Sequence, residues 1–177
     1  MKKQLTLTIL FLSFFAVSFA QDANQISTMR FGPFKLGSKI AEVEGILKSK
    51  VQVKKRGDNW ADTINAKYNG ADYRLVFTNE TDEKNQTTWK LYSISSKNTS
   101  LKTKSGIGIG STKPQILLAY DKFNLTVTND WEYKEKNNVK DKIQFIQLAD
   151  YEAETMIYFT TVDRNVTEIE VSYNIGD

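Results

Sequence analysis

The stretch that decides the fold reads Leu36-Gly37-Ser38-Lys39-Ile40-Ala41-Glu42-Val43-Glu44-Gly45-Ile46-Leu47, and it has a counterpart in Ile109-Gly110-Ser111-Thr112-Lys113-Pro114-Gln115-Ile116-Leu117-Leu118-Ala119-Tyr120. Both stretches begin with an apolar residue followed by Gly and Ser, and both continue into the apolar face of a helix. The Gly allows a sharp turn, and Ser38 and Ser111 are expected to cap the helices. Pro114 falls in a first helical turn, where its missing N–H costs nothing.

Beyond each of these helices the apolar residues recur with a period of two, which is typical of strands. In the first half we expect strands over residues 62–68, 71–78 and 89–96, the first two joined by the hairpin signal Asn69-Gly70. In the second half we expect strands over 125–133, 142–150, 153–159 and 166–173. The polar and basic stretch 98–105 has the composition of a joint between the halves.

The pattern therefore predicts an α+β fold of two repeated units, each a helix followed by a small antiparallel sheet. The first unit would span residues 21–100 and the second 101–177. Two arrangements stay open at this point: separate sheets, or one larger sheet with the helices on one side.

The N-terminus has the pattern of an export signal. Met1-Lys2-Lys3 is followed by an apolar run that ends in Ser18-Phe19-Ala20, which predicts a signal peptide over residues 1–20 and a mature chain that begins at Gln21. The run is shorter than the roughly 20 apolar residues of a membrane span, and no Cys follows it to carry a lipid anchor. We therefore expect a periplasmic or secreted protein with no membrane span after removal of the signal.

Composition excludes several classes of activity. The chain of 177 residues contains no His and no Cys, so it has neither an imidazole base nor a thiolate nucleophile, and it lacks the commonest ligands of zinc and copper. Glu154, Glu168 and Glu170 could supply a carboxylate pair, but alternating Glu on a strand is typical of a solvent-facing ladder. The prediction is a protein that is not an enzyme and that needs no cofactor or metal.

Two stretches have some features of a phosphate loop and of a cation-binding loop, but each has a simpler interpretation. Gly106-Ile107-Gly108-Ile109-Gly110-Ser111-Thr112-Lys113 lacks the Gly-Lys-Ser/Thr order of a phosphate loop, and a strand that enters a capped helix explains it as well. The oxygen-rich stretch 79–85 lacks the Gly and the distal Glu of a calcium loop, so a hairpin tip is the better interpretation.

The two Gly-Ser-led helices, each followed by hairpin strands in an exported chain, resemble the β-lactamase-inhibitor-protein fold. The single unit is also similar to the outer-membrane assembly lipoprotein SmpA, or BamE. The lipidation Cys and the inhibitor's disulfides are absent, since the chain has no Cys. The resemblance implies a non-catalytic module that grips another protein with the face of its sheet.

Strand register indicates which side chains would contact a partner protein on the face of the sheet. With Asn69-Gly70 as the turn, Ile64 lies opposite Leu75 and Ala66 opposite Tyr73 on the core side. The residues expected on the open faces, as partner contacts, are Arg74, Trp89, Leu91, Phe145, Met156, Tyr158, Glu168 and Glu170. A slip of one residue would exchange the faces, and the aromatic residues could instead pack under loops or between sheets.

Charge is divided unequally along the chain. Residues 21–104 carry 15 basic and 9 acidic side chains, whereas residues 105–177 carry 7 basic and 12 acidic. The halves could attract each other, the bias could be accidental, or a polarised surface could steer a partner. A near-neutral mature chain argues against nucleic acid as the partner. We expect a binding module for another periplasmic or envelope protein, or alternatively a carrier of a small apolar or lipid-like ligand held between helices and sheet.

Overall fold

Strands, not helices, dominate this protein. The computed structural model describes residues 25–54, 61–81, 87–129 and 143–174, and it is 57% strand and 12% helix, arranged as sheets of four and seven strands with two short helices. The predicted α+β fold of two helix-plus-sheet repeats is therefore wrong. The helices are α2 (Ile40–Leu47) and α3 (Lys113–Ala119), eight and seven residues long, so the apolar stripes that predicted them cover barely two turns each.

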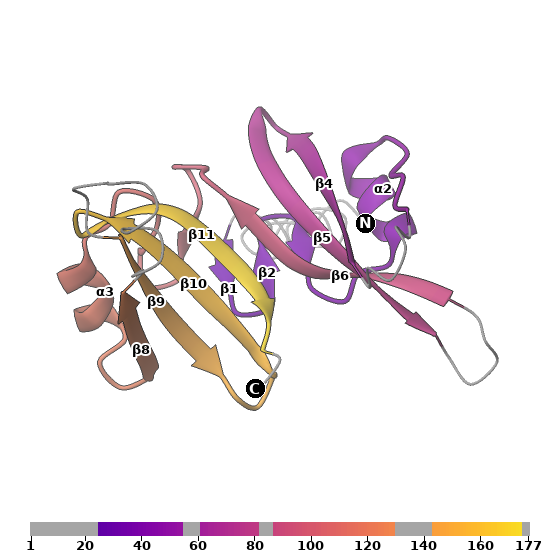
Figure 1. The fold of residues 1–177 in the computed structure, drawn as a ribbon. Helices are drawn as coiled ribbons and strands as arrows, with labels where there is room; N and C mark the ends of the chain where they lie inside the picture. Colours follow the sequence, from indigo (N-terminus) through magenta and orange to yellow (C-terminus); the bar gives the residue numbers. More distant parts are fainter. Residues whose placement is uncertain (1–24, 55–60, 82–86, 130–142, 175–177) are drawn as a thin grey trace, which may run out of the picture.

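One antiparallel sheet contains seven strands from both parts of the chain. Its order is β4 (Ala61–Tyr68), β5 (Ala71–Thr81), β6 (Thr87–Ser96), β11 (Asn165–Tyr173), β10 (Thr155–Val162), β9 (Ile143–Asp150) and β8 (Asn124–Asn129), as Figure 1 shows. Asn69 and Gly70 form the β4–β5 turn with φ of 47° and 80°, as a type I′ hairpin turn requires. The predicted pairs Ile64–Leu75 and Ala66–Tyr73 are confirmed.

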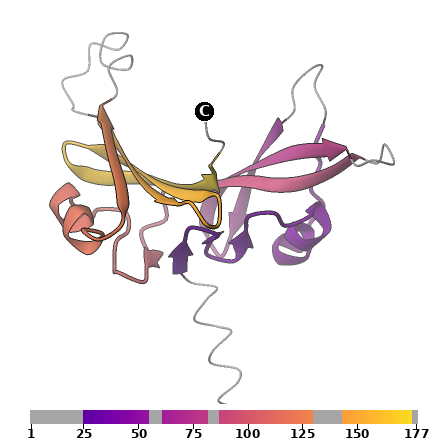
Figure 2. The same cartoon turned by 90° about the horizontal axis from the view of Figure 1, so that it is seen from below.

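A second, four-stranded sheet packs against the large one. It contains β1 (Gln25–Ser27), β2 (Arg30–Phe31), β3 (Phe34–Lys35) and β7 (Lys102–Thr103), in the order β3-β2-β1-β7. The stretch 98–105, expected as a joint, thus supplies a strand that pairs in parallel with β1. Figure 2 shows both helices and this small sheet on the same side of the large sheet.

The core lies between the two sheets and under the helices. Its largest fully buried side chains are Phe31, Phe34, Phe77, Phe159, Leu75, Leu91, Ile94, Ile116, Ile146, Ile157, Ile169 and Val43. The apolar stripe of α2 packs on this core as predicted, with Val43 fully buried. The apolar stripe predicted for the second helix contained Ile116, Leu117 and Tyr120. Ile116 in α3 and Tyr120 just after it are buried as predicted, whereas Leu117 is 38% exposed.

Each Gly-Ser pair joins its helix to a strand. The N–H of Gly37 donates to Leu91 O and the N–H of Leu91 to Ser38 O; in the same way Gly110 donates to Val166 O and Val166 to Ser111 O. The helix caps fall one residue later than predicted, at Lys39 and Thr112. The N-cap residue of a helix accepts the first intrahelical hydrogen bond with its carbonyl group. The carbonyl groups of the two serines accept from the neighbouring strand instead, so each helix begins one residue later.

A β-bulge in β6 overturns the predicted positions of Trp89 and Leu91. Val76 pairs with Ser93 and Phe77 with Leu91, so Tyr92 is an extra residue opposite β5. An extra residue exchanges the faces of everything that precedes it on the strand. Leu91 is therefore fully buried in the core and Trp89 packs against the core, and neither lies on the open face.

No helix in the described ranges is long and apolar enough to cross a membrane. The predicted signal peptide, the end of the strand expected over 125–133 and part of the 79–85 loop lie outside the described residues.

Candidate binding face

The face of the large sheet that points away from the helices is the candidate site. In the described part of the chain, no helix or strand covers this face (Figure 2). Residues alternate regularly across it: on β10 and β11, Ile157, Phe159, Ile169 and Val171 are buried toward the core as predicted, while Tyr158 and Glu170 between them are partly exposed. We call this surface the open face.

A groove of about 450 Å³ crosses the open face where β6, β11, β10 and β9 lie side by side. We call it the tyrosine groove. Its lining residues are Tyr92, Phe145, Gln147, Tyr158, Thr160, Glu168, Glu170, Ser172 and Tyr173. Four aromatic rings and two carboxylates thus converge on one surface of the sheet.

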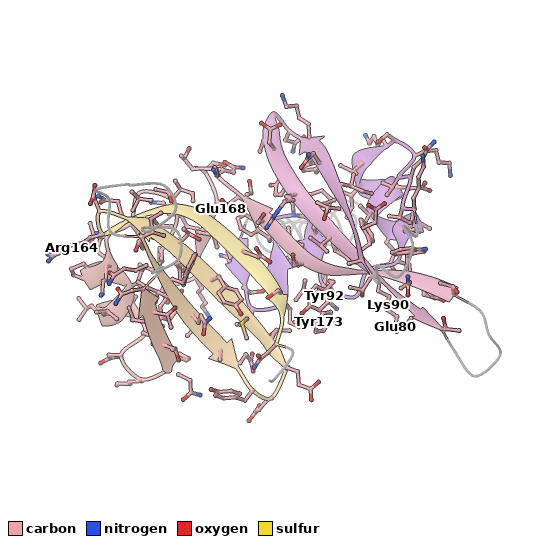
Figure 3. The ribbon with its side chains drawn as sticks, viewed as in Figure 1. Glu80, Lys90, Tyr92, Arg164, Glu168 and Tyr173 are labelled. Carbon is pink, nitrogen blue, oxygen red and sulfur yellow. The ribbon has the colours of Figure 1, made fainter. Side chains whose placement is uncertain are left out.

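Tyr92 and Tyr173 close one end of the groove, and Glu168 lies toward the other end of β11 (Figure 3). The two rings lie 5.9 Å apart, and the Tyr92 hydroxyl donates to the Tyr173 carbonyl oxygen at 3.2 Å. Burial, together with the neighbouring Tyr158 phenol and Glu170 carboxylate, raises the pKa of Tyr92 above its ordinary value of 10.0. The groove therefore holds Tyr92 as a neutral phenol.

The structure brings together most of the residues predicted for this face. Phe145, Tyr158, Glu168 and Glu170 all line the tyrosine groove. Met156 lies on the same strand face, opposite Ser172, but only 6% of it is exposed. Met156 is thus a support of the groove rather than part of its surface.

Tyr92 and Tyr173 were missed by the sequence analysis. The bulge turns Tyr92 toward the open face together with Ser93, although residues i and i+1 on a regular strand face opposite sides. Tyr173 ends the strand 166–173, two residues after the buried Val171 and therefore on the same side of the strand, where it packs partly against the core. Its contact with Tyr92 could have been anticipated only from the pairing of β6 with β11.

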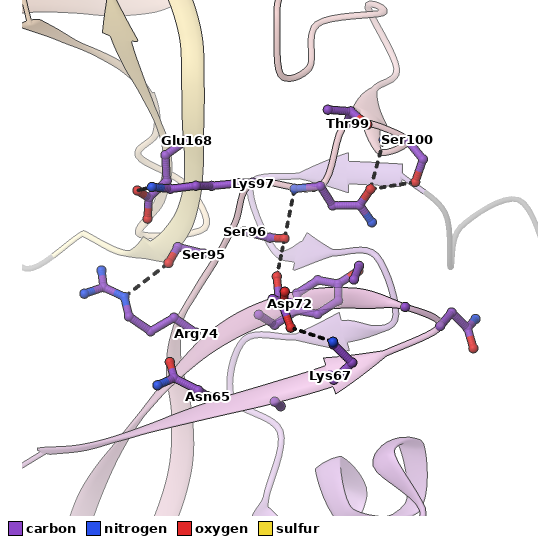
Figure 4. Close-up of a pocket in the computed structure, with 16 residues that line it drawn as sticks. Asn65, Lys67, Asp72, Arg74, Ser95, Ser96, Lys97, Thr99, Ser100 and Glu168 are labelled. Atoms are coloured by element: carbon purple, nitrogen blue, oxygen red, sulfur yellow. Dashed lines mark hydrogen bonds and ion pairs between the residues drawn. The ribbon is translucent and has the colours of Figure 1, made fainter.

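A second hollow, of about 800 Å³, lies beside the first at the β4–β5 turn and shares Glu168 with it. We call it the charged hollow. Figure 4 shows its contacts: Arg74 Nε donates to Ser95 Oγ at 3.2 Å, and Lys67 lies 3.6 Å from Asp72. Arg74, the remaining predicted contact residue, lines the charged hollow and does not line the tyrosine groove.

Ion pairs across the β6–β11 junction explain part of the uneven charge. Arg74 lies 3.2 Å from Glu170, and Lys97 lies 3.7 Å from Glu168. In both pairs the cation comes from the basic half and the carboxylate from the acidic half. These pairs fit the interpretation that the two halves attract each other, and they give the tyrosine groove a rim of paired charges.

The other candidate sites find little geometric support. Glu154 is the turn residue before β10, with φ of 52°, so it is not part of a carboxylate ladder with Glu168 and Glu170. Among the described residues no group of three or more Asp or Glu side chains is placed to hold a metal. In the glycine-rich stretch, Gly108 packs against the backbone of Leu101, and a Cβ there would lie 2.7 Å from Leu101 O.

An alkaline titration followed by tyrosinate absorbance tests the surroundings of Tyr92. Burial also raises the pKa of Tyr73, so we expect Tyr73 and Tyr92 to ionise above the ordinary tyrosine range. A raised pKa means that the folded state favours the neutral phenol. The contribution of these two tyrosines to the free energy of unfolding is therefore full below the ordinary tyrosine pKa, and it is lost as the pH rises through the raised pKa. The Tyr92→Phe variant should lose one late-ionising group; an unchanged titration curve would place Tyr92 in solvent.

Comparison with protein-family models, curated proteins and solved structures finds no match to this chain.

Proposed function

We propose that the protein is a non-catalytic binding module that holds a segment of another periplasmic or envelope protein in the tyrosine groove. The observation that supports this most directly is a cluster of aromatic side chains, partly exposed, at the centre of a sheet face that no described helix or strand covers. Export of the chain is part of the proposal and rests on the N-terminal sequence.

The chemistry of the groove favours a protein as the ligand. Tyr and Phe rings offer a large apolar contact area with few rotatable bonds, and the phenol groups add hydrogen bonds, which is why tyrosine is enriched in protein interfaces. Gln147, Thr160 and Ser172 supply neutral polar groups between the rings. Gripping with the sheet face is also the mode that the resemblance to β-lactamase-inhibitor and BamE-type modules implies.

The carrier alternative is less well supported because its expected ligand space is filled. Val43 of α2 and Ile116 of α3 are fully buried in the core that the helices share with the large sheet. Phe34 makes edge contacts with Tyr73 at 4.9 Å and with Tyr68 at 6.0 Å. Side chains of the protein itself thus occupy the place that an apolar ligand would need.

Alanine variants at two tyrosines test the proposal with matched chemistry. Tyr158 lies in the groove, whereas Tyr151 is 64% exposed in the turn between β9 and β10, outside the residues that line it. We would recover the partner by crosslinking in the native envelope, purify it, and measure its affinity by calorimetry. Tyr158→Ala should weaken binding about thirtyfold, the effect of losing a central aromatic contact, and Tyr151→Ala less than about twofold.

Equal affinities of the two variants would contradict binding in the groove. A small molecule that leaves the protein only on denaturation, with no stoichiometric protein partner, would favour the carrier instead. In that case Tyr158→Ala should leave the amount of bound molecule unchanged.

A further inference from the structure

The two edges of the seven-stranded sheet are protected very differently. At the β4 edge, the Lys54 N–H donates to the Asp62 carboxylate at 2.7 Å, so the chain that leaves α2 lies beside this strand. At the β8 edge, the described residues provide pairing on one side only, from β9. β8 has six residues and pairs with β9 in a continuous register. It contains no charged residue and no Pro, the residues that commonly prevent an edge strand from pairing with another chain.

Exposed apolar side chains are concentrated beside this edge. Of the five large apolar residues that the described ranges expose, four belong to α3, β8 and the turn between them: Leu117 at 38%, Leu118 at 79%, Phe123 at 62% and Val127 at 39%. Figure 2 shows α3 next to the sheet at the end opposite α2. A pairing edge and an apolar surface therefore lie together.

The sequence of β8, Asn124-Leu125-Thr126-Val127-Thr128-Asn129, is complementary to itself. In an antiparallel pair centred on Thr126, Leu125 of one copy lies opposite Val127 of the other. Both residues are on the core side, since they pair with the buried Leu148 and Ile146 of β9. No like charges meet in this register, and apolar residues face apolar residues.

We infer that β8 is the interface between two copies of this chain, paired antiparallel with Thr126 opposite Thr126 of the second copy. The two-fold axis of such a pair is perpendicular to the sheet, so both copies of α3 lie on the same side of the joined sheet, next to the axis. Leu118 and Phe123 of one copy are thereby brought toward the same residues of the second copy and away from water. Both tyrosine grooves lie on the opposite side, facing the same direction.

Charges introduced at Thr126 test the interface and its register together. Thr126 is exposed and pairs with Gln147 on the open-face side, so Lys or Glu fits there without disturbing the core. By sedimentation over about a hundredfold range of concentration, the unaltered protein should pass reversibly from the mass of one chain to that of two. Thr126→Lys and Thr126→Glu should each weaken dimerisation about tenfold or more, because like charges meet at the axis, and mixing the two variants should restore it.

Thr63 on β4 provides the matched control, since it is exposed on the other edge strand of the same sheet. Thr63→Lys should dimerise like the unaltered protein. If mixing the two charged variants restores the dimer, each variant is folded, because an unfolded chain would not dimerise. A single-chain mass at every concentration, loss of dimer in Thr63→Lys as well, or no recovery on mixing would overturn the inference.

Discussion

Replacing Phe159 with alanine is expected to lower the free energy of unfolding by about 3–5 kcal/mol, as loss of a buried aromatic side chain does. Phe159 is fully buried on β10, between Ile146 of β9 and Ile169 of β11. Its ring stacks on Tyr120, which follows α3, at 6.3 Å. Because strands hold the ring on two sides and Tyr120 contacts it, the surroundings cannot collapse fully into the cavity, and part of the cost is the cavity itself.

Phe145→Ala is the matched control on the opposite face of the same sheet. Phe145 lies on the neighbouring strand β9, pairs with Thr160 and lines the tyrosine groove, where it is partly exposed. We expect its removal to cost about 1 kcal/mol, since most of the lost contact is with a surface that water already reaches. Urea unfolding of both variants checks the assignment of faces; equal losses of stability would contradict it.

The parts of the fold that could be predicted are those fixed by local geometry. A type I′ turn at Asn69-Gly70 sets the register of β4 and β5, because its two residues with positive φ leave a single way to align the strands. The alternation of apolar residues on β10 and β11 likewise identified their core side, and with it Tyr158 and Glu170 in the groove. Such features need no knowledge of the rest of the chain.

The parts that could not be predicted depend on pairing between distant segments. The bulge at Tyr92 has no signature in β6 itself, and it alone decides that Leu91 is buried and that Tyr92 is in the groove. The strands β1, β2, β3 and β7 are two or three residues long, too short to show a period of two. Without a visible period, residues 98–105 were interpreted as a joint between the halves, residues 25–35 were assigned no strand, and the share of strand in the fold was underestimated.

Alanine at Gly37 and at Gly110 should have similar effects on stability but different effects on the groove. Both glycines have positive φ, 77° and 83°, and both donate an N–H at 2.8 Å to a strand carbonyl, so alanine strains both backbones alike. We expect each substitution to lower the free energy of unfolding by about 1–2 kcal/mol. The difference lies in what the added methyl group meets.

A Cβ at Gly37 would lie 2.7 Å from the Tyr173 hydroxyl oxygen, whereas a Cβ at Gly110 meets nothing within 4 Å. Because the end of a tyrosine side chain yields more easily than backbone, the Tyr173 ring should move, and its contact with Tyr92 should be lost. Gly37→Ala is therefore expected to change the near-ultraviolet circular dichroism of the tyrosines and to weaken partner binding about tenfold or more, and Gly110→Ala to do neither. If both variants altered the tyrosine signal equally, backbone strain alone would explain it. The turn at Gly37 would then have no part in shaping the groove.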